Sequence, residues 1–212
     1  MRSIGILVLV MACTLGSLPV SAQQPPGPPA AAPALAPIDA GLLAQLRKGG
    51  FLIFFRHGLT PNYADPGGDP SFDTCSSQRN LSKEGIEQAK AIGEGFRELD
   101  IPLGIVRASP YCRCMDTAWH AFGRGERDMG LRLAGSNIDS DKVEARRYRD
   151  MRNLAKILPL PGTNSVFVSH GSAGEVFGAG YLDEGEAVIV QPDGAGSWKL
   201  IGRVKSTQWR QP

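Results

Sequence analysis

The chain has 212 residues, enough for one domain with a sizeable core but not comfortably for two. Its composition is typical of a globular protein, with 42% hydrophobic and 21% charged residues. The formal net charge of +2 excludes a strong field that would attract nucleic acid or an anionic membrane, so we expect no nucleic-acid partner. Any preference for an anion must come from a local cluster of side chains.

The N-terminal part of the chain is predicted to lie outside the folded domain. Residues 1–22 have the pattern of a secretory signal peptide, because Arg2 precedes an apolar run and Val20-Ser21-Ala22 forms a small-residue cleavage site. Residues 23–37 form an uncharged stretch rich in Pro and Ala, which cannot build a core and is predicted to be a linker. We therefore expect a domain over residues 38–212 that is periplasmic or secreted, with no stable membrane span after cleavage.

The cysteines also bear on the compartment. Acylation of Cys13 would instead make the protein a lipoprotein, and an uncleaved apolar run would make it membrane-anchored. Cleavage leaves Cys75, Cys112 and Cys114, and an oxidising compartment then predicts one disulfide and one remaining thiol. Residues two apart on a helix point to different faces, so Cys75 should pair with one of the other two. We favour the pair Cys75 and Cys112.

Within the domain, helical patterns alternate with short apolar runs. Helices are predicted for four segments, namely 39–48, 82–99, 111–122 and a last one from about 139 to 158. Strands are predicted for five, namely 51–55, 104–108, 165–168, 186–190 and 198–204. This order predicts an α/β fold. We expect a three-layer sandwich with a mostly parallel central sheet, helices on both faces and an antiparallel hairpin near the C-terminus.

Polar residues follow three of the predicted strands where each strand ends. These are Arg56-His57-Gly58, Ser109-Pro110 with Arg113 shortly after it, and Ser169-His170-Gly171. In open α/β sheets, ligands bind beyond the carboxyl ends of the strands. Arginine offers a fork of donors that matches phosphate oxygens, and a neutral imidazole can attack phosphorus. Two arginines and two histidines at one edge therefore predict a site for a phosphate ester.

These residues lie in four motifs that resemble those of the histidine phosphatase (phosphoglycerate mutase-like) superfamily. The motifs are RHG at 56–58, L-[ST]-x-x-G-x-x-Q-A at 81–89, S-P-x-x-R-x-x-x-T-A at 109–118, and the second-histidine segment at 168–171. They occur in the order of the family and cover most of the domain. The resemblance implies an enzyme without metal or cofactor, and it implies roles for six residues. These are His57 as nucleophile, Arg56 and Arg113 as phosphate clamps, His170 as electrostatic partner, and Thr60 and Asn62 as substrate contacts.

The sequence departs from the family in one respect. Family members usually supply a carboxylic acid that protonates the leaving oxygen. No Glu occupies the loop at 131–139, where the mutase-like members carry one, and Gly171-Ser172 stands where other members have an acid after the second His. Asp139 and Glu175 are the nearest candidates for a general acid. Without such an acid, the enzyme is expected to prefer good leaving groups, such as those of phosphohistidine or aryl phosphates.

The expected function is an exported phosphomonoesterase that acts on a small-molecule or protein phosphate ester through a phosphohistidine intermediate on His57. A phosphomutase is one alternative, although export argues against it because the phosphorylated cofactor of such mutases is cytosolic. Another is a non-catalytic phosphate- or phosphosugar-binding module of the same fold. A zinc site built from the histidines is disfavoured, because two neighbouring arginines would repel a dication. The sequence leaves the physiological substrate and the oligomeric state open.

Overall fold

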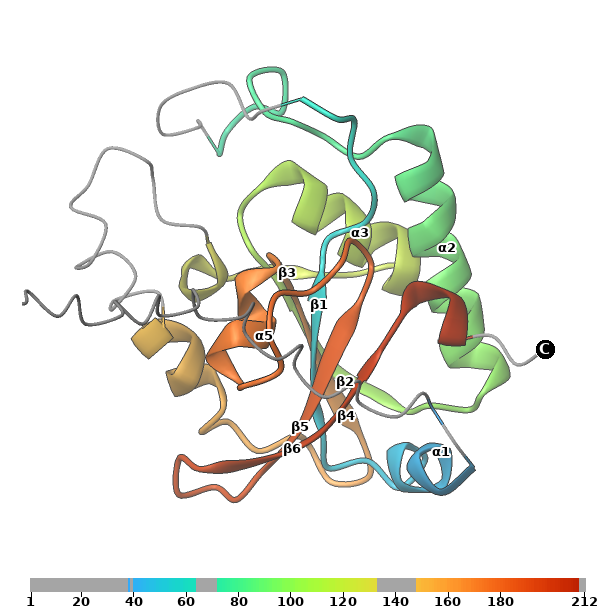
Figure 1. Ribbon diagram of the computed structural model, residues 1–212, viewed down its shortest axis with the longest axis vertical. Helices are drawn as coiled ribbons and strands as arrows, with labels where there is room; N and C mark the ends of the chain where they lie inside the picture. The colour runs from blue at the N-terminus through green and yellow to red at the C-terminus, as the bar shows by residue number, and fades with distance from the viewer. Residues whose placement is uncertain (1–37, 39, 64–71, 133–147, 210–212) are drawn as a thin grey trace, which may run out of the picture. The chain divides into compact units, whose positions relative to one another are not determined.

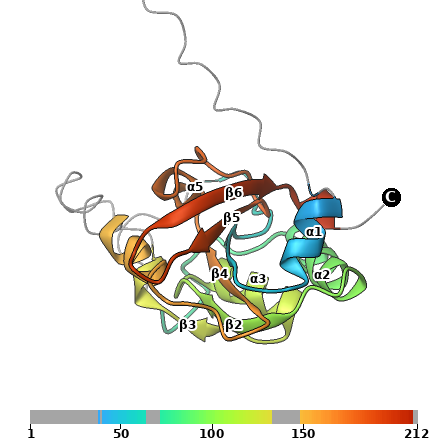
Figure 2. The same cartoon turned by 90° about the horizontal axis from the view of Figure 1, so that it is seen from below.

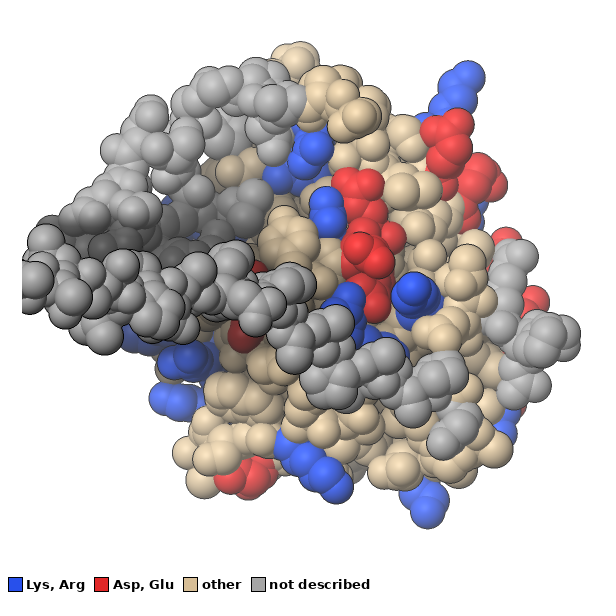
Figure 3. All heavy atoms as spheres, in the orientation of Figure 1, with Lys and Arg blue, Asp and Glu red and all other residues tan. Residues whose placement is uncertain are grey.

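The computed structural model describes residues 38, 40–63, 72–132 and 148–209 (Figure 1). The predicted signal peptide and linker therefore lie outside the described residues, and the predictions made for them stay predictions. Within the described ranges, none of the helices combines the length and the apolar character needed to cross a bilayer. Figure 3 shows acidic and basic side chains interspersed on one face of the molecule, as expected for a net charge of only +2.

A six-stranded sheet, with strand order β3-β2-β4-β1-β5-β6, forms the centre of this part of the chain. Its strands are β1 Leu52–Arg56, β2 Leu103–Ala108, β3 Glu126–Arg127, β4 Asn164–Ser169, β5 Ala187–Pro192 and β6 Trp198–Val204. The first four strands in chain order run parallel, β5 is antiparallel to β1, and β6 is antiparallel to β5. The mixed, mostly parallel sheet with its C-terminal hairpin confirms the predicted fold class.

Helices pack on both faces of the sheet (Figure 2). The α-helices are α1 Ala40–Leu46, α2 Lys83–Glu98, α3 Cys112–Phe122 and α5 Ser172–Val176, and two short 3-10 helices are η1 Met129–Leu131 and η2 Ser206–Trp209. One hydrophobic cluster joins the sheet to α1, α2, α3 and η2. A second cluster, on the opposite face, joins it to η1, α5 and a helix over 148–154; the last predicted helix, expected to reach about residue 158, thus ends at 154, and Leu158 is exposed.

The sequence of β1 shows why this strand lies in the middle of the sandwich. Its side chains alternate between the two faces, with Ile53 and Phe55 in one cluster and Leu52 and Phe54 in the other. All four are buried, which explains why the sequence of the strand is a continuous apolar run and does not alternate between apolar and polar residues. Such a strand cannot lie at a sheet edge without exposing apolar surface. Its central place therefore follows from its composition.

Elements that the sequence did not predict are all short. They are β3, η1, α5 and η2. The residues of β3 are exposed and become a strand only because they pair with Arg107 and Ala108 of β2. The long helix α2, in contrast, begins as predicted, since the Ser82 hydroxyl accepts a hydrogen bond from the Gly85 amide at 3.1 Å.

Candidate active site

The register of two parallel strands brings the predicted histidines together. Arg56 at the end of β1 lies beside Ser169 at the end of β4, so the residues that follow them, His57 and His170, emerge side by side. The His57 amide continues the ladder by donating to the Ser169 carbonyl at 3.0 Å. The two imidazole rings meet edge to face with 5.7 Å between their centroids. The pairing of β1 with β4 thus determines the distance between the two histidines.

The next strand, β2, adds the second arginine from the other side of β4. Ser109 follows this strand, and its hydroxyl lies 3.0 Å from Nε2 of His170. The chain then enters α3, which carries Arg113 in its first turn with no exposed side-chain surface. The Tyr111 ring lies 4.4 Å from the Arg113 guanidinium carbon and 5.0 Å from the His170 ring, so it packs against both groups.

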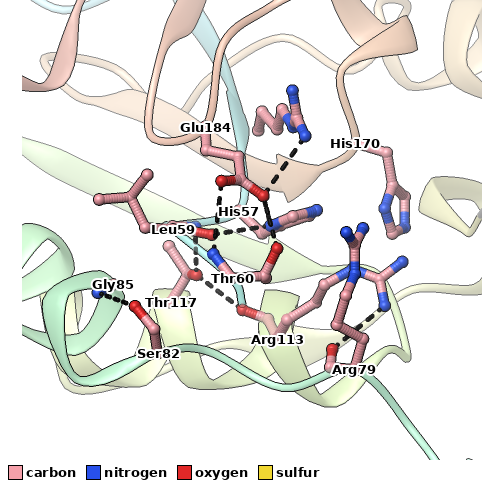
Figure 4. A network of polar contacts seen from close by, with 12 residues as sticks. His57, Leu59, Thr60, Arg79, Ser82, Gly85, Arg113, Thr117, His170 and Glu184 are labelled. Carbon is pink, nitrogen blue, oxygen red and sulfur yellow. Dashed lines mark hydrogen bonds and ion pairs between the residues drawn. The ribbon is translucent and has the colours of Figure 1, made fainter. Parts of the chain in front are cut away.

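The four residues predicted to carry the chemistry converge on one place. Figure 4 shows the side chains of His57, His170 and Arg113 pointing toward one another, the histidines from the segments that follow β1 and β4 and the arginine from α3. Arg56 and Arg113 are both close enough to act electrostatically on the His57 ring. The structure therefore brings these four side chains together, and the roles assigned to them stay predictions.

The surroundings of His57 keep its ring neutral. Burial is the main cause that lowers the pKa of His57 from 6.5 to about 3; the hydrogen bond to the Gly58 carbonyl acts in the opposite direction, and the nearby charges of Arg113, Arg56 and Arg79 add to the lowering. Nδ1 lies 2.9 Å from the Gly58 carbonyl, which can only accept a hydrogen bond. The proton of the neutral ring is thus on Nδ1, and Nε2 carries a lone pair. A neutral imidazole with a free lone pair is the form that acts as a nucleophile.

The spacing of residues within the motifs has a direct structural explanation in the turn after His57. The Thr117 hydroxyl accepts from the Gly58 amide at 2.9 Å and donates to the Arg113 carbonyl at 2.6 Å. It therefore ties the turn after His57 to α3, the helix that carries Arg113. Gln88 contributes as well, because its Oε1 accepts from the Leu59 amide at 3.0 Å.

Gly85 allows α2 to approach this turn closely. A Cβ atom at this position would lie 2.0 Å from the Leu59 carbonyl oxygen, which no real side chain could tolerate. The glycine in the L-S-x-x-G motif is therefore required by the contact between α2 and the segment after His57. Chain flexibility is not the reason, because Gly85 lies inside a regular helix.

The two predicted substrate contacts lie differently. Thr60 is partly buried, and its hydroxyl donates to Oε1 of Glu184 at 2.6 Å. Asn62 is exposed. Their assignment to substrate binding stays a prediction for both.

Glu184 is a site residue that the sequence analysis missed. It lies in the loop between α5 and β5, and its carboxylate is 3.4 Å from the Arg56 guanidinium and 4.0 Å from Nδ1 of His57. The Gln88 side chain holds the same loop by donating to the Glu184 carbonyl at 3.1 Å. No motif marks this glutamate. It reaches the site because β5 pairs with β1, and the sequence does not reveal that pairing.

Arg79 is the second residue that was missed. Its charge contributes to the lowered pKa of His57, and its carbonyl accepts a hydrogen bond from the Arg113 guanidinium at 3.4 Å. Figure 4 shows its side chain beside that of Arg113. The only sequence signal was a basic residue directly before the Asn80-Leu81-Ser82 start of α2. The site therefore contains three arginines rather than two.

Only one of the two candidates for a general acid lies in the described part of the chain. Asp139 lies outside the described residues. Glu175 is exposed on α5, and its carboxylate accepts a long hydrogen bond of 3.4 Å from the Tyr148 hydroxyl. In the described part of the chain, His, Cys, Asp and Glu side chains form no group of three that could hold a metal ion.

A disulfide lies next to the site. Cys75 and Cys112, the pair that we favoured, are joined, and the remaining thiol, Cys114, is buried. The Cys114 thiol donates to the Ser169 carbonyl at 3.3 Å. Cys112 is the first residue of α3 and immediately precedes Arg113, so the cross-link is attached directly beside this arginine.

Comparison with known proteins agrees with this geometry. The model of the histidine phosphatase superfamily (branch 1) matches residues 52–156. No curated protein sequence matches the chain at a significant level.

Several solved structures share the fold. A phosphoserine phosphatase from Entamoeba histolytica, in complex with 3-phosphoglyceric acid, is 17% identical, with a TM-score of 0.54 over 76% of this chain and 99% of its own. The protein histidine phosphatase SixA, complexed with tungstate, is 15% identical, with a TM-score of 0.51 over 76% of this chain and 99% of its own. A mycobacterial glucosyl-3-phosphoglycerate phosphatase is 19% identical, with a TM-score of 0.51 over 72% of this chain and 97% of its own.

Proposed function

The chain belongs to branch 1 of the histidine phosphatase superfamily, and on that premise we propose that it is an exported phosphomonoesterase. The observation that carries the proposal is the state of His57. This ring is buried, neutral and directed toward His170, with the charges of Arg56, Arg79 and Arg113 around it. A neutral nucleophile within a cationic shell suits a dianionic phosphate ester better than a neutral substrate.

In the proposed reaction, Nε2 of His57 attacks phosphorus, the bond to the leaving oxygen breaks, and a phosphohistidine forms. The guanidinium groups of the site hold the non-bridging oxygens, which carry the charge during transfer. The Gly58 carbonyl keeps the Nδ1 proton in place, so the ring remains correctly oriented as its positive charge develops. Water then attacks phosphorus, and inorganic phosphate leaves with regeneration of the neutral imidazole.

The leaving oxygen needs a proton unless it departs as a stable anion. Glu184 is ion-paired with Arg56, and Glu175 is exposed, so neither glutamate is assigned as the proton donor to the leaving oxygen. We therefore propose that the preferred substrates are phosphate groups on good leaving groups, such as aryl phosphates or phosphohistidine. The solved neighbours, at under 20% identity, support the fold and do not choose among these substrates.

Hydrolysis of p-nitrophenyl phosphate tests the proposal, because its leaving group needs no general acid. The wild-type domain should release p-nitrophenol, whereas the His57→Ala variant should not. His120→Ala is the matched control, since His120 lies near the end of α3 and should leave activity unchanged. Acid-labile radioactive phosphate bound to wild type but not to His57→Ala would identify the intermediate. Equal activity of wild type and His57→Ala would refute the proposal.

A non-catalytic phosphate-binding module is the second candidate. The exposed position of Glu175 favours it, because the leaving group then has no assigned proton donor. This candidate predicts that orthovanadate or phosphate binds to wild type while p-nitrophenyl phosphate is not hydrolysed.

Export is a separate part of the proposal. It is supported by the signal-like residues 1–22 and by the disulfide between Cys75 and Cys112, which is typical of oxidising compartments. Expression of the full chain in a bacterium with a periplasm, followed by N-terminal sequencing, tests it. A mature protein that begins at Gln23 in the periplasmic fraction is the expected result. An uncleaved chain in the cytosol would contradict it.

A further inference from the structure

The segment 72–80, which carries Arg79 to the site, has neither helix nor strand to hold it. Residues 73–77 are exposed, and Gln78 is the buried member of the segment. A segment of this kind contributes little apolar burial to its own stability and is expected to open locally at low free-energy cost. The position of Arg79 must therefore come from specific links to the rest of the domain.

Those links converge on the first turn of α3. The disulfide joins Cys75 to Cys112, and Oε1 of Gln78 accepts from the Cys112 amide at 2.9 Å. The Arg113 guanidinium donates to the Arg79 carbonyl at 3.4 Å. The residue that precedes the phosphate-binding Arg113 is thus cross-linked to the segment that carries Arg79.

The segment is also organised around Cys75 itself. The Cys75 carbonyl accepts from the Gln78 amide at 3.1 Å and from the Asn80 side chain at 2.8 Å. The Gln78 side chain, in addition, donates to the Thr74 carbonyl at 3.2 Å. Arg79 lies between Gln78 and Asn80, which are both hydrogen-bonded to the Cys75 carbonyl. Displacement of Cys75 from α3 would therefore move Arg79 with it.

We propose that the disulfide between Cys75 and Cys112 positions Arg79 beside Arg113, so that the oxidised protein binds phosphate esters more tightly than the reduced protein. The inference rests on the proposed phosphatase function and adds that full substrate affinity requires the intact disulfide. Arg79 and Arg113 form a pair of adjacent cations, which repel each other without an anion between them. The cross-link holds the two arginines close before the substrate arrives, which lowers the entropic cost of assembling the site.

Reduction reverses this arrangement by known chemistry. A dithiol donates two electrons and two protons to the bond, gives two thiols at Cys75 and Cys112, and becomes a cyclic disulfide itself. Cys75 is exposed, so the bond is open to attack from that side. Combined with the proposed export, the enzyme would gain its full affinity only after it reaches an oxidising compartment.

The test compares KM and kcat for p-nitrophenyl phosphate in four proteins: wild type, Cys75→Ser/Cys112→Ser, Arg79→Ala and the triple variant. The double cysteine variant and Arg79→Ala should each raise KM about tenfold and change kcat by less than about threefold, as expected for one charge-assisted contact. The triple variant should be little worse than either. Dithiothreitol should raise the KM of wild type to the same extent and leave the double cysteine variant unchanged.

Each outcome has one meaning. If wild type hydrolyses the substrate but Arg79→Ala, which keeps the disulfide and should fold, has the wild-type KM, then this proposal is wrong and the phosphatase function stands. A triple variant whose loss equals the product of the two separate losses would show independent effects and also overturn the proposal. If wild type neither hydrolyses p-nitrophenyl phosphate nor binds orthovanadate, both proposals fail. Circular dichroism at the assay temperature checks that every variant is folded.

Discussion

The carboxylate of Glu184 accepts two hydrogen bonds from Thr60, one from its hydroxyl at 2.6 Å and one from its amide at 3.3 Å. The same carboxylate forms an ion pair with Arg56. Because Arg56 precedes His57 and Thr60 follows it, one glutamate from a distant loop contacts the chain on both sides of His57. This arrangement makes Glu184 a positioning residue, whose effect on the reaction passes through its neighbours.

Replacement of Glu184 should therefore lower catalysis without abolishing the fold. We expect Glu184→Ala to reduce kcat/KM by about 10- to 100-fold, since Arg56 and Thr60 lose a common partner and one charge-assisted contact is worth about 1.5–3 kcal/mol. Glu184→Gln keeps an acceptor for Thr60 and should lie between Ala and wild type. Steady-state kinetics with p-nitrophenyl phosphate measures both. A Glu184→Ala variant as active as wild type would show that the contact has no positioning role.

The lowered pKa of His57 predicts a pH dependence of stability. In the unfolded chain the His57 ring binds a proton near pH 6.5, whereas in the folded protein the same ring, with a pKa of about 3, stays neutral until about pH 3. Stability should thus fall as the pH decreases from 6.5 toward 3, with a contribution from this group of up to about 1.4 kcal/mol per pH unit. His57→Asn cannot bind the proton and should lose less stability over this range. Urea unfolding of both proteins at pH 7, 6 and 5 checks this, and parallel curves would contradict the assigned cause.

Thr117 should matter for both stability and activity. Thr117→Val leaves the buried amide of Gly58 without its acceptor, which costs about 1–3 kcal/mol. The turn after His57 also loses its tie to α3, so kcat/KM should fall in parallel. Thr117→Ser keeps the hydroxyl and is the matched control. The free energy of unfolding in urea and the kinetics of both variants decide the question, and equal behaviour of Val and Ser would contradict this explanation.

Gly85→Ala tests the close approach of α2 to the nucleophile's turn. A Cβ atom would overlap the Leu59 carbonyl, so α2 or the turn must shift, with an expected destabilisation of about 1–3 kcal/mol. In an exposed position of a helix, replacement of Gly by Ala stabilises instead, by up to about 1 kcal/mol. The sign of the change in the thermal midpoint therefore distinguishes the two cases. Glu98→Ala, at the exposed end of the same helix, should leave the midpoint nearly unchanged.

The fold class and four of the site residues were predictable because their signals are local. A run of five apolar residues predicts a strand buried on both faces, and a motif at the end of such a strand places its side chains at the carboxyl edge of the sheet. This reasoning was sufficient for His57, Arg56, Arg113 and His170. Short elements such as β3 carry no comparable signal, because they become regular only through pairing with a neighbour that is already in place.

The sequence by itself predicted the type of chemistry, since the guanidinium fork matches phosphate oxygens and a neutral imidazole can attack phosphorus. Only the tertiary structure decided which further side chains complete the site. Glu184 arrives through the antiparallel pairing of β5 with β1, and Arg79 lies beside Arg113, whose guanidinium donates to the Arg79 carbonyl. Both contacts join segments far apart in the chain, and the spacing of residues along one segment contains no information about which distant segment will pack against it.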